Sequence, residues 1–266
     1  MHEFFDRFIE IVSDPTNKKI SRHKKAGTIE GGYIYMHNGV KIYRDSYYGS
    51  FSDIFIINQG VHEPQEEYIF SLVLDKIKKI NPVTLELGSY WAFYSLSILE
   101  KIPEAKCFLI EPGEFEISCG IRNFELNKKK GTFVKNNIGV NGINVDWFLK
   151  NNNIEHLDIL HSDIQGYEME MLKGSVEYLS NKKIDYIFIS THSNGLHNDC
   201  IDFLEKHDYH IICSVNLDET YCCDGIIVAQ SKNIEILLAD LDKKNKDLLI
   251  SKAELLEIFN SNGITL

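Results

Sequence analysis

The sequence predicts an α/β fold in which a mostly parallel sheet, with one antiparallel edge strand, has helices on both faces. Strand-like and helix-like segments alternate from residue 83 onward, and such alternation implies right-handed crossovers between parallel strands. The two closing strand-like segments, residues 209–216 and 225–230, have no helix between them and therefore imply an antiparallel pair. Residues 28–58 are rich in strand-forming residues, which predicts a β-rich N-terminal extension.

The N-terminal part begins with MHEFFDRFIEIVSDP, in which the spacing of apolar residues predicts an amphipathic helix. In the extension, YIYM and VKIY flank His37-Asn38-Gly39, and Asn-Gly is a strong hairpin signal. DIFIIN, residues 53–58, predicts a third short strand. EPQEEYIFSLVLDKIKKI predicts a helix, because Pro64 suits a first turn and Glu66 and Glu67 suit its positive end.

The alternating part of the chain predicts five strands followed by a closing pair. The five strands are VTLELGS, AKCFLIEP, GTFVKNNIGV, LDILHSD and IDYIFISTH. The helices are YWAFYSLSILEKI, EFEISCGIRNFELNKK, QGYEMEMLKGSVEYLS and LHNDCIDFLEKH, and a charged helix from about Ile234 to Asn260 ends the chain. We therefore expect a helix and small β-rich extension over residues 1–60, an α/β domain over 61–232 and a C-terminal helix within 233–266.

Composition excludes several classes of protein. Acidic residues outnumber basic ones by 39 to 28, and a net charge of −11 argues against general nucleic-acid binding. No apolar run approaches the roughly 18 residues of a membrane span, and the acids in the first apolar stretch do not suit a signal peptide. None of the six cysteines is part of a C-x-x-C pair. A chain of this length without an export signal predicts reduced thiols and a cytoplasmic location.

The tips of the first two strands of the alternating part suggest a nucleotide site. Glu86 ends the first strand, Gly88 allows a tight turn, and the small Ala92 lets the next helix approach. Glu111 ends the second strand, about twenty residues further on, where a carboxylate holds a ribose diol. An ordinary strand-to-helix turn and an NAD(P) site remain alternatives at this point. The single glycine and the bulky Trp91 disfavour the NAD(P) site.

Several motifs resemble those of the FkbM family of S-adenosylmethionine-dependent methyltransferases. In chain order they are GVHEPQEE, ELGSYWA, the pair Glu111-Pro112, NFELN at 123–127 and DILHSDIQGYEMEMLKG, within roughly residues 60–230. The resemblance implies a Rossmann-like class I methyltransferase sheet over 61–232 and S-adenosyl-L-methionine as the cofactor. The sequence departs from the family pattern at Tyr90 and Ala92, where the family prefers Asn and Gly, and at His161 and Gln165, where it has Lys and Glu.

The residues predicted to bind the cofactor are Glu86, Gly88, Ser89, Trp91, Glu111 and Asp163. The residues predicted to be catalytic are His161, Asp163 and His192, because they follow or end two neighbouring strands. Two mechanisms fit them. In one, either histidine is the general base and Asp163 orients it or the acceptor. In the other, Asp163 and His192, with His161 or Glu168, hold a divalent metal ion that binds the acceptor oxygen.

The acceptor side is less specific. Members of the resembled family often methylate hydroxyls on glycans and capsule precursors, which implies a small-molecule or glycan-precursor acceptor and O-methylation here. The tyrosines of the extension suit sugar faces, and the extension is a candidate substrate cap. The basic stretch from Lys18 to Gly27 would suit a phosphorylated acceptor. The alternatives are an NAD(P)-binding oxidoreductase and a non-catalytic binding module of the same fold.

Overall fold

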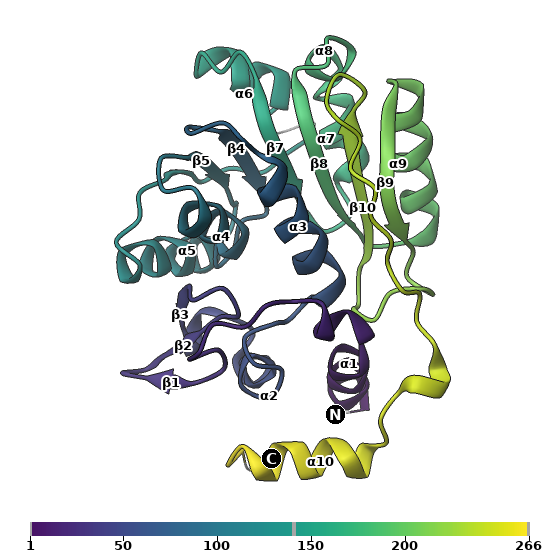
Figure 1. Ribbon diagram of the computed structural model, residues 1–266. Coiled ribbons are helices and arrows are strands. Elements are labelled where there is room, and N and C mark those ends of the chain that lie inside the picture. The colour runs from purple at the N-terminus through teal and green to yellow at the C-terminus, as the bar shows by residue number, and fades with distance from the viewer. Residues whose placement is uncertain (1, 140–141, 265–266) are drawn as a thin grey trace.

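A seven-stranded sheet forms the centre of the computed structural model, which describes residues 2–139 and 142–264 (Figure 1). Its strand order is β6-β5-β4-β7-β8-β10-β9. The strands are β4 (Val83–Leu87), β5 (Lys106–Ile110), β6 (Thr132–Val134), β7 (Leu157–Ser162), β8 (Ile184–Thr191), β9 (Tyr209–Val215) and β10 (Gly225–Ser231). The strands from β6 to β8 are parallel, and β10 lies between β8 and β9 and is antiparallel to both. The predicted fold class is confirmed, with the antiparallel strand one place in from the edge.

Helices cover both faces of this sheet and create two apolar cores. One core receives side chains from α3 (Pro64–Lys76), α4 (Phe93–Lys101) and α5 (Glu114–Leu126). The other receives side chains from α6 (Val145–Asn151), α7 (Glu168–Lys173), α8 (Val176–Ser180) and α9 (Asn194–Lys206). The segment predicted as one helix after β7 is therefore two short helices, and α6 was not predicted. No helix in the described ranges is long and apolar enough to cross a membrane.

Strand β7 shows why its sequence is a continuous apolar run. All six of its residues are buried, because helices cover both faces of the strand. Ile159 packs in the core with α3 and α4, whereas Leu160 packs in the other core. His161 shares the face of Ile159, since side chains alternate along a strand. The alternation therefore points His161 toward the helices that follow the N-terminal extension.

The extension, together with α1 (His2–Ser13), gathers at one end of the sheet (Figure 1). It contains an antiparallel sheet of β1 (Ile29–Glu30), β2 (Tyr33–Tyr35) and β3 (Lys41–Tyr43), with the predicted Asn-Gly turn between the last two. Two asparagines of the NFELN motif join this sheet to α5. Asn127 accepts a hydrogen bond from the backbone of Lys41 and returns one, and Asn123 accepts one from the backbone of Tyr43.

Two predictions are wrong, one for the N-terminal extension and one for the C-terminal segment. DIFIIN contains a helix, α2 (Ile54–Ile57), because a short apolar run that is buried on several sides fits either conformation. The C-terminal helix α10 spans only Lys252–Ser261, opened by a Ser251–Glu254 capping box. The preceding segment, residues 234–245, is non-helical because its backbone bonds to Gln65, Gln230 and the loop before β10.

A buried polar cluster at the start of α3 connects the extension to the part of the chain that forms the seven-stranded sheet. One carboxylate oxygen of Glu67 accepts the backbone N–H groups of His62 and Glu63 at 2.8 and 2.9 Å, and it lies 2.6 Å from Nδ1 of His62. The other lies 3.0 Å from Nε2 of His37. Burial opposes a charge on His62, but Glu63 and Glu67 outweigh it and raise the pKa of His62 to about 10.

We predict that Glu67→Ala lowers the free energy of unfolding by about 3–5 kcal/mol, because it leaves the buried His62 imidazolium without one of its two carboxylate partners and removes the partner of His37. Denaturant titration at pH 7 measures the change. The exposed Glu257→Ala, on α10, is the control and is expected to change stability by less than about 0.5 kcal/mol. Equal effects of the two substitutions would contradict a stabilising role for the cluster. In the wild type, the raised pKa of His62 means that its contribution is complete below about pH 6.5 and is lost as pH rises through about 10.

Candidate functional site

Two cavities open at the carboxyl ends of the parallel strands. The first, of about 330 Å³, lies between the turn after β4, the tip of β7 and the N-terminal extension. The second, of about 280 Å³, lies beside the tip of β5. Gly88, Asp163 and Gln165 line both. A ligand with two parts could therefore cross from one cavity to the other over Gly88, at the position where α/β sheets bind ligands.

The turn after β4 fits closely against the end of β7. Gly88 has a φ of +72°, and a Cβ atom there would lie 1.7 Å from the carbonyl oxygen of Asp163. Tyr90 and Ala92 also have positive φ angles, of 36° and 63°. These are two of the positions where the sequence departs from the family pattern of Asn and Gly, the residue types that favour this conformation. The turn therefore holds Tyr90 and Ala92 in a left-handed backbone conformation that Asn and Gly adopt more readily.

Glu111 lies where the two cavities approach the turn. It is 7% exposed and lines the second cavity. Its carboxylate accepts hydrogen bonds from the backbone of Tyr90 at 3.1 Å and of Gly113 at 2.9 Å. Burial raises its pKa above the usual range, although both bonds oppose this. Each oxygen keeps a further lone pair, so the group can also accept two ligand hydroxyls.

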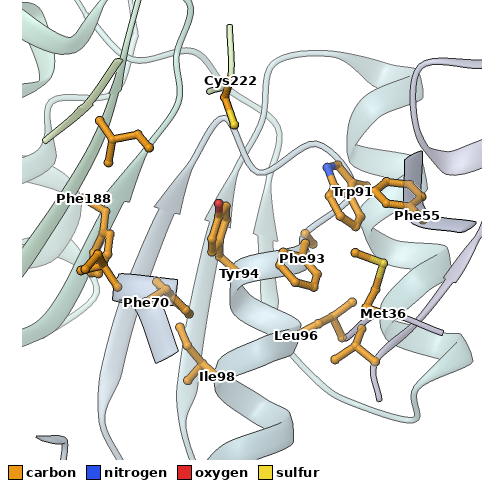
Figure 2. Close-up of a cluster of buried hydrophobic side chains, with 14 of the residues drawn as sticks. Met36, Phe55, Phe70, Trp91, Phe93, Tyr94, Leu96, Ile98, Phe188 and Cys222 are labelled. Carbon is orange, nitrogen blue, oxygen red and sulfur yellow. The ribbon is translucent and has the colours of Figure 1, made fainter. Parts of the chain in front are cut away.

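The other predicted cofactor residues on this turn line the first cavity. Glu86 is buried and accepts the backbone N–H of Ser95 at 2.9 Å, and burial raises its pKa. The buried hydroxyl of Ser89 has no hydrogen-bond partner among the described residues. Trp91 is 6% exposed and packs beside Phe55 and on Phe93, 5.0 Å away, so most of its ring belongs to the core (Figure 2).

His161 is paired with α3. Its Nε2 lies 2.7 Å from a carboxylate oxygen of Glu66, and its Nδ1 has no hydrogen-bond partner among the described residues. The ring of Tyr94 lies 4.0 Å from the His161 ring, and the Tyr94 hydroxyl donates to Glu63. The pKa of Glu66 is raised by burial, and the pKa of His161 is raised by Glu66 in spite of burial. Both shifts favour the protonated form of each group.

His192 lies among three carboxylates at the end of β8. Its Nε2 is 3.3 Å from Asp163 and 3.4 Å from Asp224, and its Nδ1 is 3.2 Å from Glu168. Burial opposes a charge on the ring, but these carboxylates outweigh it and raise the pKa of His192 to about 10. The structure thus brings His192 together with Asp163, whereas His161 pairs with Glu66. In this arrangement His192 is protonated at neutral pH and has no free nitrogen to accept a proton.

Asp224 was missed from the sequence. It directly precedes β10, and because β10 is antiparallel, its first residue pairs with Thr191 at the end of β8. Asp224 lines the first cavity, and burial and the neighbouring Asp163 raise its pKa to about 6. The feature of the sequence that could have indicated Asp224 as a site residue is the pair Asp224-Gly225 at the start of the last strand. Reading it required knowing that this strand inserts beside β8.

The predicted metal pair, Asp163 and His192, forms an ion pair here. In the part of the chain that the structure describes, one group of three ligand-type side chains has all its ligand atoms within 4.8 Å of one another. It consists of His156, Asp158 and Asp185, which lie at the amino ends of β7 and β8, away from the two cavities. Asp158 there already forms an ion pair with Lys79 at 2.9 Å. A metal at Asp163 and His192 stays a prediction.

The N-terminal extension supplies one wall of the first cavity. Arg7, Tyr47, Tyr48 and Phe51 line it. The basic stretch lies elsewhere, because Lys19, Arg22 and His23 line a separate cavity of about 590 Å³ between the extension and the helices α3 and α4.

Solved structures of several methyltransferases are similar to this chain. Precorrin-6y C5,15-methyltransferase from Geobacter metallireducens is 15% identical, with 62% of this chain and 88% of that chain covered and a TM-score of 0.46. Methyltransferase FkbM from Methylobacillus flagellatus is 16% identical, with 57% and 44% covered and a TM-score of 0.47. TrmK from M. capricolum, in complex with S-adenosyl-homocysteine, is 15% identical, with 73% and 84% covered and a TM-score of 0.42.

Comparison with curated protein sequences gives no match. The family model described as the methyltransferase FkbM domain matches residues 50–211, which is more than half of the chain and includes the carboxyl ends of β4, β5, β7 and β8. The chain therefore belongs to the FkbM methyltransferase family.

Proposed function

We propose that this FkbM-family methyltransferase transfers the methyl group of S-adenosylmethionine to a hydroxyl group of a sugar, a glycan precursor or a related small polar acceptor. The observation that supports this best is the pair of cavities that meet over Gly88. They offer separate places for a nucleoside and for the reacting groups. The cytoplasmic location predicted from the cysteines, all six of which are free, is part of the same proposal.

The donor's adenosine is assigned to the second cavity. Ile110, Ile138 and Ile164 give that cavity an apolar lining that suits a base, and Glu111 at its edge suits the ribose hydroxyls. The methionine part then lies over Gly88 and Ser89. This assignment directs the methyl group toward the first cavity.

The acceptor is assigned to the first cavity, where Tyr47 and Tyr48 suit a sugar face. In the methyl transfer, the acceptor oxygen forms a bond to the methyl carbon as the carbon–sulfur bond breaks. The acceptor proton passes to a base. Asp224, with a pKa of about 6, is largely ionised at pH 7 and takes this role in our proposal, and the protonated His192 positions Asp224 and Asp163.

We predict that Glu111→Ala weakens binding of S-adenosylhomocysteine by about 1.5–3 kcal/mol, because hydrogen bonds to a charged group are lost. Isothermal titration calorimetry measures the affinity. Glu114→Ala, three residues further on and exposed, is the control and is expected to leave the affinity unchanged. An unchanged affinity in Glu111→Ala would remove Glu111 from the donor site.

We predict that Asp224→Asn lowers turnover by about 10²–10⁴-fold, the usual contribution of a general base, and leaves S-adenosylhomocysteine affinity nearly unchanged. The wild-type rate should fall as pH drops below about 6, because Asp224 becomes protonated, and Asp224→Asn should lack this limb. The rates are measured on an acceptor found by screening sugars and nucleotide sugars, with the exposed Asp199→Asn as control. A rate that Asp224→Asn leaves intact would exclude Asp224 as the base.

We predict that exhaustive dialysis against EDTA leaves turnover unchanged, because His192 is held as an imidazolium by the carboxylates that would otherwise bind a metal. Turnover is compared before dialysis, after it, and with Mg²⁺ or Mn²⁺ added back. A rate that is lost with EDTA and restored by either ion would support the metal mechanism at Asp163 and His192 instead.

A further inference from the structure

The charged side chains that line the first cavity nearly all have partners. Glu63 lies 3.1 Å from Nε2 of His62 and accepts a hydrogen bond from Tyr94. Asp163 and Asp224 both contact His192. Glu86 accepts a backbone hydrogen bond, and burial raises its pKa. The acidic side chains of this cavity are therefore satisfied within the protein.

Arg7 differs from these groups. It projects from α1 and is partly buried, and its Nη2 donates one hydrogen bond, to the hydroxyl of Tyr47 at 3.0 Å. Its guanidinium lies 5.2 Å from the centre of the Phe51 ring. Among the side chains that the structure describes, in residues 5–139 and 142–264, no carboxylate lies within ion-pair distance of Arg7, although Glu63 lines the same cavity. A guanidinium has five N–H donors, so most of the hydrogen-bonding capacity of Arg7 is free for a ligand.

We propose that Arg7 is the anion anchor of the first cavity and binds a carboxylate or phosphate group of a bound ligand. A guanidinium held on an aromatic ring presents a planar pair of donors that matches such a group. The proposal rests on the proposed function, because that function supplies two sources of the anion. One is the carboxylate of the donor's methionine part. The other is an acidic group on the acceptor, such as that of a sugar acid or a sugar phosphate.

The basic stretch predicted to recognise a phosphorylated acceptor does not line this cavity. Lys19 pairs with Asp242 and Lys25 pairs with Glu30, so two of its cations already have partners. Arg7 is thus better placed than that stretch to receive an anion beside the reacting groups.

Calorimetry on the wild type, Arg7→Gln and Arg7→Lys tests the assignment. The probes are S-adenosylhomocysteine, 5′-methylthioadenosine (the same nucleoside thioether without the amino acid), glucose 6-phosphate, glucuronate and glucose. Arg122→Gln is the matched control, because that guanidinium also lies over an aromatic ring, Tyr43, but outside the cavity. Thermal unfolding checks that each variant is folded, and Arg7→Lys preserves the charge if Arg7→Gln does not fold.

If Arg7 binds the donor carboxylate, Arg7→Gln lowers the affinity for S-adenosylhomocysteine by about tenfold or more and leaves the affinity for 5′-methylthioadenosine unchanged. If Arg7 binds an acceptor anion, Arg7→Gln leaves the affinity for both nucleosides unchanged. It lowers the affinity for glucose 6-phosphate or glucuronate by a similar factor. The affinity of Arg7→Lys for the same probe is expected to lie between those of the wild type and Arg7→Gln.

The wild type could bind S-adenosylhomocysteine while neither Arg7 variant changes the affinity for any probe that carries a carboxylate or phosphate. This result would overturn the assignment of Arg7 and leave the proposed function standing. A wild type that binds neither nucleoside would overturn the proposed function. In that case the titrations with glucuronate and glucose 6-phosphate would test the assignment of Arg7 by themselves. Equal affinities of the wild type and Arg7→Gln for these probes, or no binding of either probe, would overturn it.

Discussion

The arrangement of this protein depends on three carboxylates in the first turn of α3 and the residue before it. Glu66 contacts His161 of β7, and Glu67 contacts His37 of the β2–β3 turn. Glu63 and Glu67 both contact His62, which directly precedes them. Through these contacts the first helix after the extension connects the β2–β3 turn, the tip of β7 and the first cavity. Buried charges are costly unless they are paired, so these segments must come together in one arrangement for the pairs to form. The Glu66–His161 pair also raises the pKa of His161 at the tip of β7, in spite of burial.

That arrangement separates two histidines that look equivalent in the sequence. His161 is shielded by Glu66 and the ring of Tyr94, whereas His192 faces the acids of the β7 and β10 tips. The acids around His192 raise its pKa to about 10, in spite of burial. The close contact of Gly88 with the Asp163 backbone brings the end of β7 next to the turn after β4. The two histidines therefore differ in their surroundings, although their residue type is the same.

The fold could largely be predicted from the sequence. Alternation of buried strands with amphipathic helices depends on short-range spacing, and that spacing is visible without a structure. The errors occurred where tertiary contacts outweigh spacing. The run at Ile54 forms a helical turn because several faces of it are buried, and residues 234–245 are held non-helical by distant backbone partners.

The sequence by itself determined the family, the α/β class and the two strand-tip acids, Glu86 and Glu111, since motif order and spacing are properties of the chain alone. Only the tertiary structure decided which groups meet. It placed Asp224 beside His192 by inserting an antiparallel strand, and it placed Arg7 in the wall of the first cavity. Contacts between residues more than thirty positions apart depend on strand order and burial. Proton positions depend in turn on those contacts, and neither can be deduced from local pattern.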